Sequence, residues 1–140
     1  LEKSIPRKLK AWNEPDTKFI VIQDQDSWDC KKLKQKLVDL CKPTGREYLV
    51  RIACHELESW YFGDLSAVSK AYNKDLTKLS QKSQYKIPDA IINPKKELQK
   101  YLPEHQQISG AEKIAEYFNP QINTSVSFQI FLSGIKKLIS

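Results

Sequence analysis

Hydrophobic residues in the first half of the chain follow two alternating patterns that predict an α/β fold. Residues 18–24 contain a continuous run of apolar, mostly β-branched residues, which is typical of a buried parallel strand, and residues 47–54 contain a second strand-like run. Between them, residues 28–41 place apolar side chains at every third or fourth position, as an amphipathic helix does. A strand–helix–strand unit of this kind predicts a mostly parallel sheet of two or three strands with helices packed against it.

The remaining segments have mainly helical patterns. Residues 2–12 predict a short helix before the first strand, and helices are expected at 65–72, at 94–101, from Ser109 to Phe118, and after Ser125 or Ser127. Residues 73–93 are polar and rich in lysine, so they are expected to form a long surface connection. We therefore expect a single domain over residues 1–140, with a sheet-forming part (1–62) and a mainly helical part (63–140).

Composition places the chain among ordinary globular proteins. Its 140 residues are 40% hydrophobic and 29% charged, and no apolar run approaches the ~20 residues that span a bilayer. The cysteines Cys30, Cys41 and Cys54 are odd in number and lack C-x-x-C spacing, which predicts buried free thiols in a reducing cytoplasm. Because the sequence starts at Leu1 and contains no Met, we also expect an amino terminus that has been cut back.

Carboxylates follow both predicted strands. Asp24 and Asp26 end the first strand, and Glu56 and Glu58 follow the second. Ligands of open α/β sheets bind beyond the carboxyl ends of the strands, and carboxylate oxygens suit Mg²⁺ or Mn²⁺. If the chain stays extended through Gln25, both aspartates project into the same crevice. The alternative is a structural role, with Asp26 or Ser27 as the N-cap of the following helix.

Glu58 is the more informative of the two glutamates. It lies among Leu57, Trp60 and Tyr61, where a buried carboxylate needs a partner such as a metal ion. Glu56 is expected in the first turn of a helix, where the helix dipole favours a negative charge, so its carboxylate needs no functional role. His55 and Glu56 do not form the zinc motif H-E-x-x-H, because Ser59 occupies the position of the second histidine.

Basic residues are compatible with an acidic partner. The net charge is +6, and Lys82, Lys86 and Lys95 are candidates for contacts to a nucleic-acid backbone. The alternative is that these lysines belong to a solvated polar loop and bind no nucleic acid. With four glycines and neither a Walker loop nor G-x-S-x-G, the chain is not expected to be a P-loop enzyme or a serine hydrolase of that type.

Several short motifs together resemble a known family. They are Asp24-Gln25-Asp26, the Glu-Leu-Glu-Ser-Trp segment at 56–60, Gly-Asp-Leu at 63–65 and Ser-Gly-Ala at 109–111. Over essentially its whole length the chain resembles a bacterial family known as domain of unknown function 4276, which is similar to Toprim domains. That resemblance implies a Toprim-like, Rossmann-like sheet in which Asp24 and Asp26 hold Mg²⁺.

Toprim domains also use a glutamate that follows an earlier strand as general acid or base. No strand with such a glutamate precedes Asp24 in this chain, so Glu58 is our candidate for a catalytic and metal-binding carboxylate. The resemblance further implies a role in prokaryotic defence, beside an ATPase of the AAA or ABC type encoded nearby. The expected function is Mg²⁺- or Mn²⁺-dependent, nuclease-type processing of nucleic-acid phosphodiesters. The alternatives are a non-catalytic accessory subunit that binds the ATPase, and a small-ligand phosphotransfer or sensor domain.

Overall fold

A two-stranded parallel sheet forms the centre of one half of the molecule. The computed structural model describes residues 2–140, in which β1 (Lys18–Asp24) pairs with β2 (Glu47–Ala53), with Val21 opposite Val50. Both predicted strands are therefore confirmed. Within the described residues the sheet has two strands, the lower of the two numbers expected.

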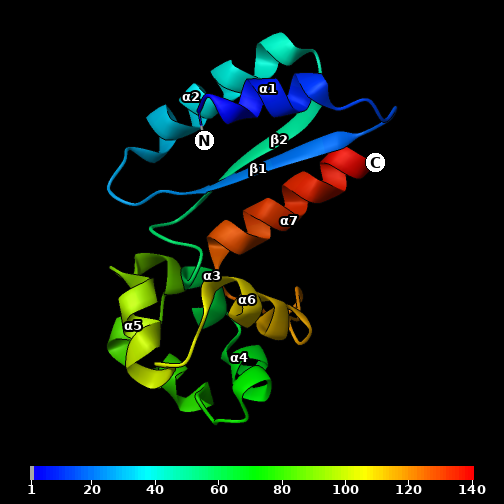
Figure 1. Cartoon of the computed structure of the whole chain (residues 1–140). Helices are drawn as coiled ribbons and strands as arrows, with labels where there is room; N and C mark the ends of the chain where they lie inside the picture. The colour runs from blue at the N-terminus through cyan, green and yellow to red at the C-terminus, as the bar shows by residue number, and fades with distance from the viewer. Residues whose placement is uncertain (1) are drawn as a thin grey trace.

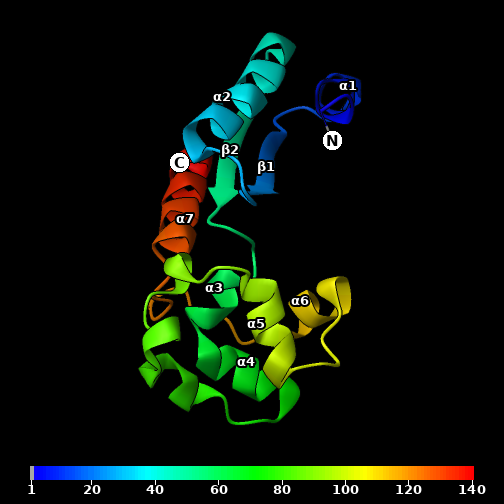
Figure 2. The ribbon, with the colours of Figure 1, turned by 90° about the vertical axis from the view of Figure 1, so that its left-hand side faces the viewer.

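Helices cover both faces of this sheet (Figures 1 and 2). α1 (Ser4–Ala11) and α2 (Cys30–Cys41) lie on one face, and α7 (Val126–Ile139) lies on the other. On the first face the core contains Ile5 and Leu9 of α1, Leu37 and Cys41 of α2, and Val50 of β2. The arrangement is an α/β sandwich, as the strand and helix patterns predicted.

The helix that follows β1 begins at a cap that differs from the two candidates. The side chain of Asp29 accepts a hydrogen bond from Lys32 N, at 2.9 Å, and α2 starts at Cys30. The expectation that Asp26 or Ser27 caps this helix is therefore wrong. Since the Asp29 side chain caps the first turn, Asp24 and Asp26 are not needed for that role.

The second half is a cluster of short helices with its own core (Figure 1). α3 (Ser59–Phe62), α4 (Leu65–Tyr72), α5 (Pro94–Tyr101) and α6 (Gln107–Ala115) surround it. The buried residues of this core include Phe62, Val68, Leu98, Leu102 and Ile114. The predicted helices at 65–72 and 94–101 are confirmed.

Residues 73–93 are not a surface connection, in contrast to the expectation. They form three short 3-10 helices, η2 (Thr77–Gln81), η3 (Ser83–Tyr85) and η4 (Pro88–Ala90). Leu79, Tyr85 and Ile91 are buried in the helical core, and the Tyr85 ring stacks on Phe62 with centroids 5.0 Å apart. Apolar side chains spaced between the lysines hold this segment in place, and the high lysine content concealed them.

Two helix starts were predicted from caps, and one of the predictions is wrong. Ser109 does not begin a helix: α6 begins at Gln107, its N-cap Gln106 makes no side-chain cap, and the helix ends at Ala115. Ser125 does cap α7, because its hydroxyl accepts a hydrogen bond from Phe128 N at 3.1 Å.

The three cysteines differ in their exposure to solvent. Cys30, Cys41 and Cys54 are free thiols, but only Cys41 is buried: Cys54 is partly buried and Cys30 is exposed, so the expectation that all three are buried is wrong. Cys30 is exposed because it is the first residue of α2, on the turn that leaves the sheet. In residues 2–140 no helix combines the length and apolar character needed to cross a membrane.

Candidate functional site

The carboxyl ends of the two strands are joined by hydrogen bonds that position the acidic residues. Asp24 is the last residue of β1, and its Oδ1 accepts a hydrogen bond from Leu57 N at 2.7 Å. Gln25 N donates to Ala53 O at 3.0 Å, and the Gln25 side-chain oxygen accepts from His55 N at 3.2 Å. The loop after β2 is thus attached to the end of β1, and this brings Glu58 towards Asp24.

Asp26 lines a different pocket from Asp24, because the backbone turns at Asp26. Asp26 has a φ of 51°, and Asp26 N donates to the carbonyl of His55, itself at φ 56°. Since the left-handed conformation ends the extended chain, Asp26 lines a pocket with His55 and Glu56, whereas Asp24 lines another. The expectation that both aspartates project into one crevice is therefore wrong.

Asp24 and Glu58 do line the same pocket. The pocket has a volume of about 350 Å³. Glu58 immediately precedes α3 and is only 5% exposed. The other lining residues come from β1, from the segment between β2 and α4, and from the start of α6: Ile22, Gln23, Leu57, Tyr61, Gln107 and Ile108. The two carboxylates therefore share a small, largely apolar hollow at the end of the sheet.

Burial and mutual repulsion raise the pKa of both carboxyl groups. For Asp24 the main cause is desolvation, followed by the opposing effect of the Leu57 N–H and by repulsion from Asp26 and Glu56. The pKa of Glu58 is raised mainly by desolvation, with repulsion from Asp24 and Glu56 adding to it. Cations stabilise such groups in the charged form, so this pocket favours a positive ligand.

Tyr61 responds to the same environment. Burial first, and the nearby charge of Glu58 second, raise the pKa of its hydroxyl to about 12. The phenol is therefore protonated at neutral pH. It offers a hydrogen-bond donor beside the carboxylates, a role that the sequence pattern did not suggest.

Lys95 is the basic residue that the fold brings to the acids. Its charge lowers the pKa of both Asp24 and Glu58, although desolvation and repulsion from the neighbouring acids outweigh this effect. Its backbone N–H, in the first turn of α5, donates to Glu56 Oε1 at 3.3 Å. Glu56 was expected in the first turn of its own helix; it precedes α3 and instead caps α5.

The other two predicted lysines lie elsewhere. Lys82 Nζ is 5.6 Å from the ring centroid of Tyr101, at the opposite end of α5 from Lys95. Lys86 is exposed directly after η3. The three lysines thus do not surround the acidic pocket together, and Lys95 alone of the three lies beside it.

A second pocket adjoins the acidic one. It has a volume of about 730 Å³ and shares Gln107 and Ile108 with the pocket of Asp24 and Glu58. Its polar lining comes from the start of α5 and the region around the start of α6, including Lys95, His105 and Ser109. A lysine and polar side chains beside a carboxylate pair make the combined space suitable for a ligand with separate positive and negative parts.

His105, in the loop before α6, belongs to this second pocket. Its Nδ1 is 2.5 Å from the Tyr72 hydroxyl, and burial lowers its pKa, so the imidazole is neutral at pH 7. Its Nε2 is buried without a hydrogen-bond partner in the part of the chain that the structure describes. A Cβ added to Gly110 would lie 2.4 Å from the imidazole ring, which explains the glycine there. No spacing in the sequence links His105 to Tyr72.

The carboxylates of Asp24 and Glu58 suit a hard cation such as Mg²⁺ that binds few protein ligands. Among residues 2–140 there is no group of three or more His, Cys, Asp or Glu side chains arranged to hold a metal ion. Asp24 and Glu58 remain as a pair, and one oxygen of Asp24 already accepts the Leu57 N–H. Mg²⁺ is commonly bound by one or two carboxylates, with water and phosphate oxygens completing its shell. The pair fits that type of site and does not fit an all-protein metal cage.

Fold and site together define an α/β protein with an acidic pocket at the carboxyl ends of parallel strands. A family model described as domain of unknown function (DUF4276) matches residues 1–136. The chain therefore belongs to this family. No curated protein and no solved structure matches the chain.

Proposed function

We propose that this protein binds Mg²⁺ or Mn²⁺ through Asp24 and Glu58 and acts on phosphodiester bonds of nucleic acid, as a Toprim-like domain does. The observation that carries the proposal is the carboxylate pair itself, two partly buried acids with raised pKa values in one pocket. Proteins rarely keep repelling carboxylates together without a cation or a catalytic use. The parallel sheet with Asp24 at the end of β1 supports the Toprim-like interpretation, with Glu58 rather than Asp26 as the second carboxylate of the pocket.

A bound divalent ion would supply positive charge that polarises a phosphate group. The chain's own residues would bind the rest of the ligand. Lys95 can contact a phosphate oxygen where the two pockets meet, and the Tyr61 phenol can donate a hydrogen bond beside it. Asp26 and Glu56 add negative charge nearby without lining the pocket of Asp24. Lys82 and Lys86 would contact a nucleic acid only at a distance from the acids.

The experiment compares binding and cleavage in matched variants. Unfolding temperature and the cleavage of labelled DNA and RNA are measured with and without Mg²⁺ or Mn²⁺, for the wild-type chain, Asp24→Asn and Glu58→Gln. Asp39→Asn is the control, because it removes the same charge from an exposed position on α2. Metal should raise the unfolding temperature of the wild type and of Asp39→Asn but not of the two site variants. Metal-dependent cleavage should be lost with the same two substitutions. Equal metal effects in all four proteins would overturn the site.

A non-catalytic accessory subunit of an ATPase is the second candidate. It is favoured by the lack, within the described residues, of three acidic or His/Cys ligands grouped for one ion. Metal binding that depends on Asp24 and Glu58, with no cleavage of DNA or RNA in the presence of the ATPase, would select this function over the first. Lys95→Gln, with Lys82→Gln as its control, then tests whether nucleic acid still binds at the acidic pocket.

A further inference from the structure

The positive charge of the chain is concentrated on one layer of the fold. Residues 2–11 and 29–44, which contain α1, α2 and the 3-10 helix η1 (Lys42–Thr44), carry nine basic and three acidic residues, a net charge of +6. This equals the net charge of the whole chain, because the other residues contain fourteen of each sign. We call this surface the basic layer. Its nine basic side chains are all exposed: Lys3, Arg7, Lys8, Lys10, Lys31, Lys32, Lys34, Lys36 and Lys42.

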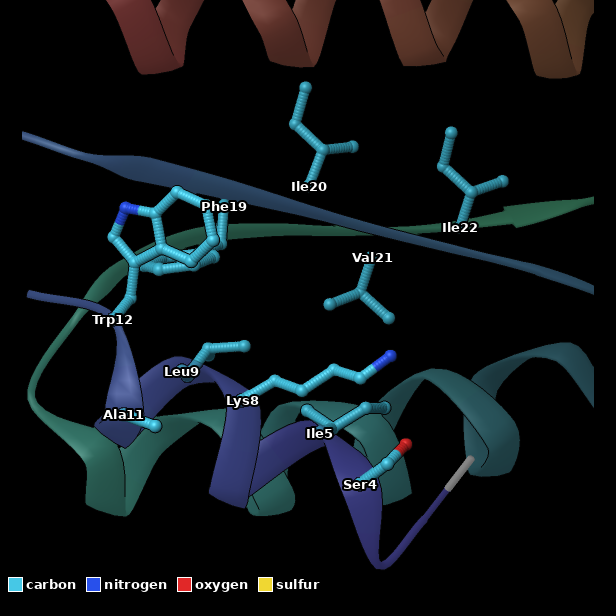
Figure 3. Close-up of a pocket in the computed structure, with 10 residues that line it drawn as sticks. All are labelled: Ser4, Ile5, Lys8, Leu9, Ala11, Trp12, Phe19, Ile20, Val21 and Ile22. Carbon is cyan, nitrogen blue, oxygen red and sulfur yellow. The ribbon is translucent and has the colours of Figure 1, made fainter. Parts of the chain in front are cut away.

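The two helices of the basic layer direct their charged faces away from the sheet. Ile5 and Leu9 of α1 point towards the strands (Figure 3). Arg7 is two positions from each of them, so it projects from the opposite side of α1. α1 and α2 pack against each other on one face of the sheet (Figures 1 and 2), and the carboxylate of Glu2 is 2.5 Å from Lys36 Nζ of α2. The basic side chains of both helices therefore form one continuous surface.

This arrangement of charge is unfavourable for the protein without a partner. Lys31 and Lys32 lie in the first turn of α2, where the helix dipole disfavours positive charge, and that turn contains no acidic residue. Lys32 and Lys36 are four positions apart, so like charges also repel along the helix. A surface that only needs to be soluble is more stable when charges of both signs alternate. An anionic partner would replace these repulsions by attraction.

The three acidic residues of the basic layer leave most of its cations unpaired. Glu2 pairs with a lysine of α2, Asp29 caps that helix, and Asp39 accepts a hydrogen bond within it at 2.8 Å. Among the ion pairs of residues 2–140, Lys36 is the one basic side chain of the layer that takes part. Eight exposed cations of the layer are therefore free to bind an anionic ligand.

Trp28 adds an aromatic ring to this surface. The ring is 58% exposed, and Lys36 Nζ lies 5.6 Å from its centroid. Surfaces that bind single-stranded nucleic acid combine cations for the backbone with aromatic rings on which bases stack. A lipid surface fits less well, because no large apolar side chain is exposed within residues 2–11 and 29–44 to insert into a bilayer.

We propose that the basic layer binds the phosphate backbone of single-stranded nucleic acid, with Trp28 as the ring on which a base stacks. Trp28 N donates to Gln25 O at 3.0 Å, and Gln25 directly follows Asp24, so this end of the layer lies towards the acidic pocket. The proposal shares its class of partner with the proposed function. It rests on different residues and needs no metal ion, so each of the two can fail without the other.

Fluorescence anisotropy with a labelled oligo(dT), in EDTA and over a range of salt concentrations, measures this binding without metal or cleavage. The triple variant Arg7→Gln/Lys31→Gln/Lys32→Gln removes three exposed cations from α1 and α2. It should weaken binding by about tenfold or more and lower the slope of log affinity against log salt by about 2. Its unfolding temperature should not fall, because repelling charges are removed.

A matched triple variant controls for net charge. Lys78→Gln/Lys136→Gln/Lys137→Gln removes three exposed cations from η2 and α7, and it should keep the salt dependence of the wild type. Equal weakening in both triple variants would overturn the proposal, as would a wild type that does not bind oligo(dT) at low salt. Tighter binding to phosphatidylserine vesicles than to oligo(dT), lost in the first triple variant, would also overturn it by assigning the layer to a lipid surface.

Two further variants separate stacking and the acidic pocket from the basic layer. Trp28→Leu should weaken binding of oligo(dT) by about fivefold or more and binding of duplex DNA much less, since a duplex offers no unpaired base. Equal losses for the two DNAs would contradict stacking on Trp28. The double variant Asp24→Asn/Glu58→Gln should bind oligo(dT) in EDTA at least as tightly as the wild type. A loss of this metal-free binding would place the strand in the acidic pocket and overturn the proposal.

Discussion

Asp24 Oδ1 accepts the hydrogen bond of Leu57 N over 2.7 Å, and this contact connects the end of β1 to the loop that follows β2. One carboxylate thus has two roles. It fixes the backbone just before Glu58, and it forms half of the acidic pair in the pocket. The structural role can be measured separately from the metal-binding role, because an amide retains the acceptor oxygen and loses the charge.

Removing the Asp24 acceptor should destabilise the fold. Asp24→Ala leaves the Leu57 N–H without its partner, and the expected loss is about 1–3 kcal/mol in the free energy of unfolding. Asp24→Asn keeps the oxygen, so it should cost much less or stabilise the protein. Urea denaturation of the three proteins gives the comparison. Equal losses for alanine and asparagine would show that the hydrogen bond does not hold the loop.

The raised pKa values of Asp24 and Glu58 predict an unusual pH dependence. The folded carboxyl groups hold protons more tightly than the unfolded ones, so their contribution to stability increases as the pH falls through the folded pKa values. The increase ends in the ordinary carboxyl range, near about pH 4. The stability difference between the wild type and the double variant Asp24→Asn/Glu58→Gln should therefore shift in favour of the wild type from pH 7 down to that range.

Denaturation in the absence of divalent metal, at several pH values, measures this difference. Asp39→Asn is again the control, because Asp39 is exposed on α2, and its difference from the wild type should not show this trend. A wild type that loses stability relative to the double variant on acidification would contradict the assignment of repelling, desolvated carboxylates.

Gly63 should not tolerate a side chain. A Cβ at this position would lie 2.0 Å from Asn123 Oδ1 and 2.9 Å from the backbone N of Ser125. Asn123 cannot move freely, because its amide donates to Trp60 O at 3.0 Å and its oxygen accepts from Ser125 N at 2.9 Å. Gly63→Ala should lower the free energy of unfolding by about 2 kcal/mol or more.

Thermal unfolding tests the prediction against a second glycine. Gly45 has a φ of 69° but open space around its Cβ position, so Gly45→Asn should have a small effect. Similar unfolding temperatures for Gly63→Ala and Gly45→Asn would mean that the segment after α6 can move away from α3.

Asp89 should be important for the stability of α7. Its carboxylate accepts hydrogen bonds from the Ser125 hydroxyl at 2.6 Å and from Ser127 N at 2.9 Å, which attaches η4 to the start of that helix. Asp89→Ala should cost about 2–3 kcal/mol, since bonds to a charged acceptor are stronger than average. Asp89→Asn offers one acceptor oxygen and should cost less. Hydrogen exchange should become faster in the first turn of α7; unchanged exchange there would contradict this role.

Periodicity predicted the regular part of the fold well. β1 ends at Asp24 as expected, because the apolar run stops at polar Gln23 and Asp24, and α5 begins at Pro94 because proline is well suited to a first helical turn. The segment at 73–93 was misinterpreted because Leu79 and Tyr85 are separated by five polar residues, Lys82 among them, and follow no regular period. Packing, rather than pattern, decides such short 3-10 turns.

The candidate site was predictable only in part. Asp24 and Glu58 were identified because parallel strands bring their carboxyl ends together, a property that follows from topology. The left-handed conformation of Asp26 has no sequence signal, since aspartate adopts it only occasionally. The approach of Lys95 depends on how α5 packs against the loop at Glu56, and this is a long-range contact that no local pattern encodes.

The acidic pocket lies where the two halves of the molecule meet, and this has a thermodynamic consequence. Asp24 extends from the sheet, whereas Tyr61 and Gln107 belong to the helical cluster, whose core is separate. A ligand that contacts both the sheet and the helical cluster keeps all of its contacts only while these two halves stay together. Its binding free energy therefore also opposes their separation, so saturation of this pocket should make the unfolding of the two halves more cooperative.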